Sequence, residues 1–404
     1  MTALIWSGFI AMILAFLALD LGVFNRRPHE ISVTEALSWT GFWVLTALAF
    51  NVLVYWFYEN NWMGVGLQFS PDIDGRTAAV EFLTGYLLEK SLSLDNIFVI
   101  ALIFSYFRVP LAYQHRVLFW GVLGALMLRG AMIWVGAALL HSFAWMTYVF
   151  GGLLLLSAAR MLVAQHDNLA AEENFVVRTT RRWVPVTTGF HGTHFFVMQD
   201  GVRMATPLLL VLLMVETTDV FFAVDSIPAI FAVTDQPFIV YTSNVFALLG
   251  LRSLYFALAP LLGRFRYLKI SLVFLLAYVG VKMLLAHSFP IPAAVSLAMV
   301  GGILGVGVIA SLIGADRDAA PLDPPFSSRQ LARTTVVHAW KGVVLIIGGT
   351  MLLIGTAMIV LSGPALIVIP VGLAILATQI VWARRLLYGA DPEADPGTDP
   401  GDES

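Results

Sequence analysis

The chain has 404 residues, of which 59% are hydrophobic and 12% are charged, and its mean hydropathy is +0.84. The net charge of −3 includes six acids in the last fourteen residues, so the remainder is slightly basic and nucleic acid is not an expected partner. The chain contains no cysteine, which excludes disulfides, iron–sulfur clusters, thiolate zinc sites and cysteine nucleophiles.

Apolar runs between charged or turn-rich breaks repeatedly reach the roughly 20 residues that cross a hydrocarbon core. We therefore expect an all-α polytopic membrane protein with about eleven transmembrane helices in a lipid bilayer. The first run has no basic start and is followed by Arg26 and Arg27, which favours an uncleaved span over a secretory signal. The predicted spans are 3–24, 35–57, 78–107, 115–140, 146–164, 205–233, 238–260, 267–287, 291–313, 342–362 and 364–384.

Polar stretches divide these spans into domains. Residues 165–204 are too polar to cross a membrane and are expected to form a cytoplasmic loop, and residues 314–341 contain APLDPPFSS, which is typical of a linker. The tail, 390–404, is rich in proline, glycine and acid and is expected to be disordered. The expected domains are a transmembrane domain at 1–313 with halves at about 1–164 and 205–313, the linker, a transmembrane hairpin at 342–389 and the tail.

Lysine and arginine are unevenly distributed between the two sides of the predicted spans. Eighteen of the 23 fall on one side, and Arg76 falls on the other. The positive-inside rule then predicts an outside N-terminus and a cytoplasmic C-terminus, in the cytoplasmic (inner) membrane of a bacterium. The remaining four cations lie inside predicted spans: Lys90, Arg129, Arg252 and Lys282.

The third and sixth predicted spans carry more acid than a lipid-facing helix tolerates. An ionised carboxylate at the bilayer centre costs roughly 2.5 to 3.5 kcal/mol even on the mildest scale, so these acids should face a cavity or each other. The acids are Glu81, Glu89 and Asp95 in the third span, and Glu216, Asp219 and Asp225 in the sixth. Acids that face a cavity inside a bilayer usually handle cations or protons.

The two acidic spans are three apart and must run in opposite directions. Glu89 and Asp95 are six residues apart, as are Asp219 and Asp225, and the two pairs are followed by Asn96 and Ser226 respectively. This similarity between the two spans predicts an inverted repeat with a substrate site near the midplane, as in many secondary transporters. The alignment stays open, because Asp95 could instead correspond to Asp219.

Helical geometry limits which acids can share one ion. Glu216 and Asp219 lie ~60° and ~4.5 Å apart on a helix, whereas Asp225 is ~180° around from Glu216 unless Pro228 distorts the helix. Glu81 is ~21 Å along its helix from Asp95 and is expected in an outer vestibule.

Structural roles are the alternative for each acid and for the histidines. An intramembrane acid can simply pair with a buried cation, and Glu89 has Lys90 as its neighbour. The histidines of HGTH, His191 and His194, are expected in the polar loop rather than as metal ligands.

SLSLDNIFVI, preceded by Glu89, and ETTDVFFAVDSIPAIFAVT resemble the signature pair of the TerC family of integral membrane proteins. The resemblance extends over about 1–313 and includes DLGVF at Asp20, HRVLFWGVLGALMLRG and SNVFALLGLRSLYFAL. It implies a transporter related to the lysine exporter superfamily, and several members of the TerC family are implicated in exporting manganese from the cytoplasm. The acids that match the family motifs are Asp20, Glu89, Asp95, Glu216, Asp219 and Asp225, with Asn96 and Ser226 as polar partners.

The C-terminal hairpin, 342–389, resembles a different family, the PGPGW transmembrane proteins. Its Pro-Gly turn is degenerate here and reads Ser362, Gly363, Pro364. Packing or regulation is the expected role of this hairpin.

Carboxylates, an amide carbonyl and hydroxyls without thiolates predict a hard oxygen site suited to Mn²⁺, Mg²⁺ or Ca²⁺. We expect a secondary transporter, not an enzyme, which exports Mn²⁺ as its substrate without a bound cofactor and is driven by proton exchange or by the membrane potential. Asp95, Glu216, Asp219 and Asp225 would bind the ion, and Glu89 and Asp20 would serve as ligands or proton carriers.

A different class of function remains open on the sequence. The chain could be a membrane component of a stress or tellurite-resistance complex, or could help to metallate exported proteins, as a homo-oligomer or with a membrane protein partner. An intramembrane hydrolase is a weaker alternative, because no nucleophile and base combination is evident.

Overall fold

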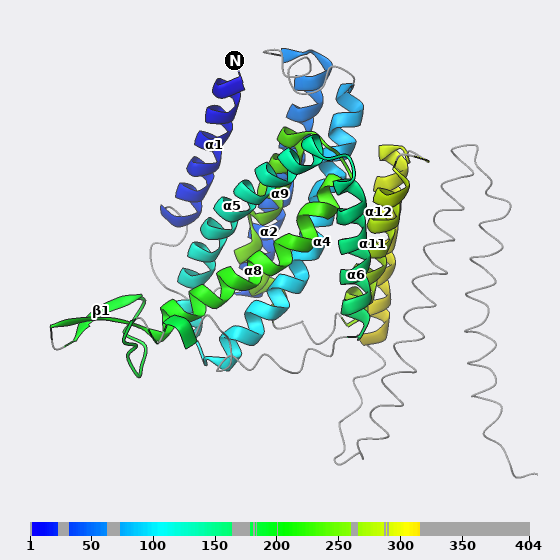
Figure 1. Cartoon of the computed structure of the whole chain (residues 1–404). Helices are drawn as coiled ribbons and strands as arrows, with labels where there is room; N and C mark the ends of the chain where they lie inside the picture. Colours follow the sequence, from blue (N-terminus) through cyan, green and yellow to red (C-terminus); the bar gives the residue numbers. More distant parts are fainter. Residues whose placement is uncertain are drawn as a thin grey trace, which may run out of the picture. The chain divides into compact units, whose positions relative to one another are not determined.

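The computed structural model describes residues 2–22, 32–62, 73–163, 178–180, 182, 184–199, 201–259, 266–286, 288 and 291–315. It is mostly helical (Figure 1). The chain divides into two compact units, Met1–Leu304 and Gly305–Ser404, and the features below belong to the first.

Helices occupy the positions of the first nine predicted spans, with ends that differ by a few residues. The tenth and eleventh predicted spans and the tail lie outside the described residues. The helices are α1 (Thr2–Gly22), α2 (Val33–Glu59), α4 (Gly75–Tyr106), α5 (Leu111–Ser142), α6 (Met146–Val163), α8 (Pro207–Phe231), α9 (Pro237–Leu248), α10 (Leu251–Leu258), α11 (Arg266–Leu285) and α12 (Ala293–Ala315).

Four of these helices, α2, α5, α8 and α12, are long and apolar enough to cross a membrane, and a fifth span results if α9 and α10 are taken together. Large apolar side chains on their outer faces are exposed, including Trp134 at 76% and Phe221 at 69%. Exposed apolar surface of this extent suits contact with lipid. The chain is therefore an integral membrane protein, while the count of eleven spans stays a prediction.

The seventh predicted span, 238–260, is broken rather than continuous. α9 and α10 meet at an angle of 42°, and Gly250 between them has φ +79°. The break leaves carbonyls without helical partners, and Lys90 of α4 donates to two of them, Ala247 O at 3.1 Å and Leu249 O at 3.4 Å. Lys90 therefore caps the end of α9 and is not the partner of Glu89.

The segment expected to be only a loop contains a short β-hairpin. Strands β1 (Phe196–Gln199) and β2 (Val202–Ala205) pair antiparallel, and Gly201 in the connection has φ +77°. The sequence signal was the Asp-Gly pair between two apolar runs, which favours a two-residue hairpin turn. Apart from this short hairpin, the described residues are mostly helical, which is consistent with the all-α membrane protein that the sequence predicts.

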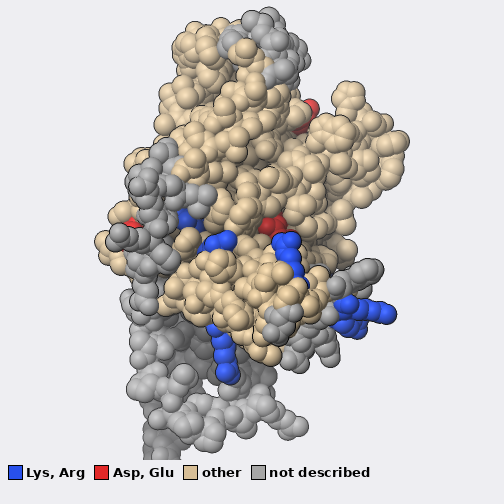
Figure 2. Space-filling view, turned by 90° about the vertical axis from the view of Figure 1, so that its left-hand side faces the viewer, with Lys and Arg blue, Asp and Glu red and all other residues tan. Residues whose placement is uncertain are grey.

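The hairpin segment is fixed to the start of α5. The Arg116 guanidinium donates to Thr193 Oγ1 at 3.1 Å and lies 5.3 Å from the centre of the Phe195 ring. At this end of the unit, lysine and arginine side chains gather on the face shown in Figure 2, whose upper part is almost free of charge. That this end faces the cytoplasm stays a prediction of the positive-inside rule.

α4 lies at the centre of the packing, with α2, α8 and α9 against it. α5 packs along α8, and α6 packs along α11. Phe50, Phe82 and Phe246 join α2, α4 and α9, with Phe50 and Phe246 stacked at 4.5 Å between ring centres. Because protein covers most sides of α4, this helix can carry acids at membrane depth without exposing them to lipid.

The start of α4 is set by Asp74 as its N-cap. The Asp74 side chain accepts a hydrogen bond from Thr77 N at 2.9 Å. Hydrogen bonds from Thr77 lower the pKa of this exposed carboxyl below its ordinary value of 3.8.

Candidate functional site

Arg129 of α5 is a buried cation held between the acids of the two opposed helices. Its side chain, that of Glu89 on α4 and that of Asp219 on α8 are all nearly enclosed, since the residues are 1%, 1% and 9% exposed. Nη2 lies 2.9 Å from Asp219 Oδ1 and Nε 3.3 Å from Asp219 Oδ2, while Nη1 forms an ion pair with Glu89 Oε1. One guanidinium is therefore shared by carboxylates from both α4 and α8.

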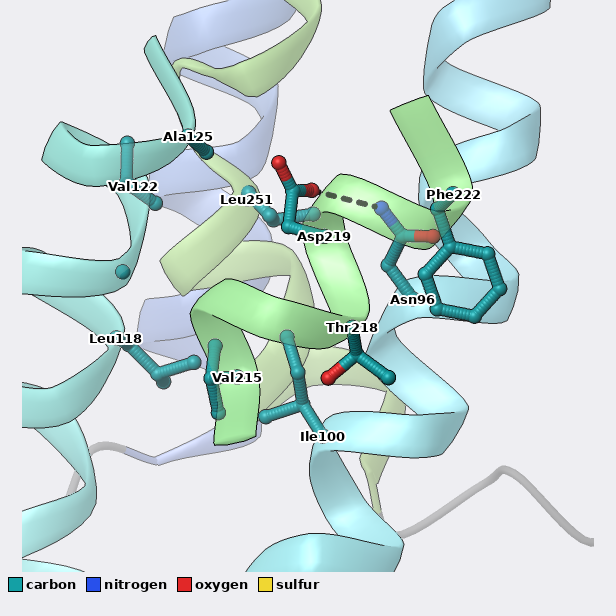
Figure 3. A pocket seen from close by; sticks show the side chains of 11 residues that line it. Asn96, Ile100, Leu118, Val122, Ala125, Val215, Thr218, Asp219, Phe222 and Leu251 are labelled. Atoms are coloured by element: carbon teal, nitrogen blue, oxygen red, sulfur yellow. Dashed lines mark hydrogen bonds between the residues drawn. The ribbon is translucent and has the colours of Figure 1, made fainter. Parts of the chain in front are cut away.

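Polar side chains from three helices extend this ion pair into a cluster that spans four helices. Asn96 Nδ2 donates to Asp219 Oδ1 at 3.3 Å, a bond drawn in Figure 3. Asn244 Nδ2 of α9 donates to Glu89 Oε2 at 3.1 Å, and Arg129 Nη1 donates to Ser226 Oγ at 3.4 Å. We call these six residues, Glu89, Asn96, Arg129, Asp219, Ser226 and Asn244, the Arg129 cluster.

Several buried oxygens in and near this cluster lack hydrogen-bond partners among the described residues. They are Asn96 Oδ1, Asn244 Oδ1, Ser93 Oγ and Glu216 Oε2. A buried acceptor without a donor is costly, and such groups need a ligand, a water or an ion to satisfy them. The first two belong to residues whose amide nitrogens already donate to Asp219 and Glu89.

A pocket reaches the cluster at Asp219 (Figure 3). Its polar lining consists of Asn96, Thr218 and Asp219, and the remainder is apolar. On α5 the lining runs from Leu118 to Ala125, which precedes Arg129 in the chain, and on α4 it runs from Asn96 to Ile100, which follows Glu89. Relative to Arg129, the pocket therefore lies toward the C-terminal end of α4 and the N-terminal end of α5.

Glu216 lies one helical turn before Asp219 on α8 and packs against α5. Its carboxylate fills the space that a Cβ atom would need at Gly124. Glycine at this position allows the acid to lie against the backbone of α5, about 7.5 Å along the axis before Arg129.

Comparison of the sequence with known protein families agrees with this helical membrane architecture. The model of the integral membrane protein TerC family matches residues 74–319, more than half of the chain. The chain belongs to the TerC family. A second model, of PGPGW transmembrane proteins, matches residues 341–390. Both resemblances drawn from the sequence motifs are confirmed.

Relatives in this family are similar over most of their length. A Myxococcus xanthus membrane protein named STKORF319 is 48% identical over 309 residues, or 76% of this chain and 92% of the relative. An Escherichia coli K12 protein named membrane-bound redox modulator Alx is 45% identical over 308 residues, or 75% and 92%. A Rickettsia bellii membrane protein is 36% identical over 308 residues, or 76% and 97%. No solved structure matches the chain.

Four of the predicted site residues of this TerC chain come together: Glu89, Asn96, Asp219 and Ser226 lie in the Arg129 cluster. Glu216 lies beside it. Asp95 is half-buried on α4, next to Asn96. Asp20 lies in α1, and its side chain is outside the described residues.

Asp225 faces a different neighbour from Asp219. It accepts a hydrogen bond from Ser157 of α6, whereas Asp219 contacts α5. α8 runs from Pro207 to Phe231 as one helix that includes Pro228, so the two acids keep the angular separation of a regular helix. Within the described ranges, no three acids or histidines lie close enough together to hold a metal ion.

Glu81, expected in an outer vestibule, is buried on α4 about 12 Å along the helix before Glu89. This separation of more than two helical turns places Glu81 outside the Arg129 cluster.

The sequence alone did not identify Arg129 as the shared partner of Glu89 and Asp219, nor Asn244 as a hydrogen-bond donor to Glu89. Arg129 was one of four intramembrane cations with no assigned partner, and Asn244 lay within the motif SNVFALLGLRSLYFAL without being singled out. A polar side chain inside an apolar span was the available signal for both residues.

Proposed function

We propose that this TerC-family protein is a secondary transporter that exports divalent metal ions, Mn²⁺ first, through the Arg129 cluster. The observation that supports this function is the set of buried, partnerless oxygens beside two carboxylates from opposed helices. A cation entering from the pocket would coordinate Asp219 and Glu89 and satisfy Asn96 Oδ1 and Asn244 Oδ1. These are hard oxygen donors, which suit Mn²⁺, Mg²⁺ and Ca²⁺.

The packing of the helices is compatible with alternating access. If α4 corresponds to α8 and α5 to α9 in an inverted repeat, then the pair α4 and α9 corresponds to the pair α8 and α5. Both pairs are in contact, and α6 packs along α11 as a third pair. Two such halves can rock about a site between them, with Glu89 in one half and Asp219 in the other.

Transport by purified protein tests the proposal. In proteoliposomes with a metal-sensitive dye inside, wild-type protein should pass Mn²⁺, and Asp219→Asn should slow the flux about tenfold or more, equivalent to ~1.4 kcal/mol of barrier. Glu35→Gln, in the first turn of α2 and outside the Arg129 cluster, is the matched acid-to-amide control and should transport as wild type does. Absence of Mn²⁺ flux in the wild type, or full flux in Asp219→Asn, would reject the proposal.

A second candidate function is a membrane component of a stress-resistance complex. The name of the Alx relatives, membrane-bound redox modulator, adds a redox role to this candidate. The exposed hairpin favours it, since Met198 and Val202 are 70% and 53% exposed and could dock a partner. This chain has no cysteine, so thiol exchange would have to be carried out by that partner. In this case, replacing the hairpin should abolish function in cells, while Asp219→Asn should preserve it.

A further inference from the structure

Arg129 poses a problem for any cation transporter built on this site. The guanidinium occupies the space between Glu89 and Asp219 and satisfies both carboxylates. An incoming metal ion must therefore displace a cation that is covalently attached to the protein. Because Arg129 is only 1% exposed, its displaced guanidinium needs a new anionic partner within the bundle.

Glu216 is placed to be that partner. It lies one turn before Asp219 on the same helix, ~4.5 Å along the axis, and its Oε2 is buried without a hydrogen-bond partner in the described part of the chain. Its carboxylate packs against α5 at Gly124. Helical side chains lean toward the N-terminus of their own helix, so the Arg129 side chain leans along α5 toward Gly124.

We propose that Arg129 is a tethered competitor of the transported ion, which bridges Glu89 and Asp219 in the empty site and moves to Glu216 when a divalent cation binds. This inference rests on the proposed transport function and adds the step that clears the site. With the ion bound, the exchange leaves Glu89 and Asp219 with the metal and Glu216 with Arg129, so each of the three carboxylates has a cationic partner. In the empty site, Arg129 is shared by Glu89 and Asp219, while Glu216 Oε2 lacks a hydrogen-bond partner in the described part of the chain and is free to receive the guanidinium.

The competition also selects for ionic charge. A monovalent ion brings no more charge to Glu89 and Asp219 than the guanidinium that it must displace, whereas a divalent ion brings twice as much. Sodium and potassium, which are abundant, would therefore leave the ion pair intact. Arg129 is in this sense a specificity-determining residue.

A static clamp is the alternative role for Arg129. A clamp would stabilise the bundle by joining α4, α5 and α8, and Glu216 would then be a metal ligand or a bystander. The two roles differ in one respect: only the exchange makes the effect of Glu216 on metal binding depend on Arg129.

A double-mutant cycle on the full-length chain separates these roles. Mn²⁺ binding by titration calorimetry and Mn²⁺ flux in proteoliposomes are measured for the wild type, Arg129→Gln, Glu216→Gln and the double variant, with Glu35→Gln as control. Arg129→Gln should bind Mn²⁺ about tenfold more tightly, transport it more slowly and become sensitive to competition by Na⁺. Glu216→Gln should weaken binding in the wild type and have no effect in the Arg129→Gln background.

Equal effects of Glu216→Gln in both backgrounds would overturn the exchange, as would unchanged Mn²⁺ binding in Glu216→Gln alone. Unchanged Mn²⁺ binding in Glu216→Gln overturns the exchange even if Arg129→Gln fails to fold. Arg129→Met then replaces it in the cycle, because methionine fills the buried space without a charge that competes with the ion. A wild type that neither binds nor passes any divalent ion would reject the transport function itself, which is a different result from an additive cycle in an active transporter.

Discussion

At the scale of single residues, the site combines acids that the sequence reveals with contacts that it does not. Glu89 and Asp219 stand out because carboxylates are expensive at membrane depth. Their shared partner, Arg129, is separated from Asp219 by 90 positions, and Asn244 is separated from Glu89 by 155. No local pattern specifies such pairs, so they follow only from the way the helices pack.

Gly124 offers a residue-scale test of the position of Glu216. In Gly124→Ala the new Cβ overlaps the Glu216 carboxylate, which must move away from α5. Alanine favours a helix by about 1 kcal/mol over glycine, so the melting temperature should not fall greatly, but Mn²⁺ flux should drop several-fold.

The matched control for this substitution is Gly152→Ala on α6, where nothing lies within 4 Å of the new Cβ. It should keep both the flux and the melting temperature of the wild type. If Gly124→Ala transports as well as Gly152→Ala does, the carboxylate of Glu216 has no role against α5.

At the scale of elements, apolar run length predicts where the helices lie but not where one of them breaks. The run 238–260 is apolar enough for one span, yet Gly250 adopts a left-handed conformation and Lys90 caps the carbonyls that are released. Glycine permits this break without requiring it. The decisive partner, Lys90, comes from a different helix.

Gly250→Ala tests the break. Alanine at φ +79° costs about 1–2 kcal/mol from the backbone alone, and its Cβ would lie 2.7 Å from Trp43 Cδ1. We expect a clear loss of thermal stability in detergent, measured by the melting temperature. Gly301→Ala on α12 has no atom within 4 Å of the new Cβ and should melt at or above the wild-type temperature. Equal melting of the two variants would show that the left-handed turn is not needed.

At the scale of the whole molecule, hydropathy and motif together predict the class and the family. The inverted repeat and manganese export stay predictions, because they rest on the matching spacing of two acid pairs and on a family resemblance. The structure adds that Glu89 of α4 and Asp219 of α8 lie on either side of one buried cation. In a bilayer, such a cluster persists only if its charges remain paired.

The position of a bound ion tests this central claim most directly. Crystals or single particles of the full-length chain prepared with Mn²⁺ should show the metal, identified by its anomalous signal in crystals, within coordination distance of Glu89 and Asp219. The Arg129 guanidinium should have moved away from both acids. Manganese bound elsewhere while Arg129 still bridges Glu89 and Asp219 would contradict the claim.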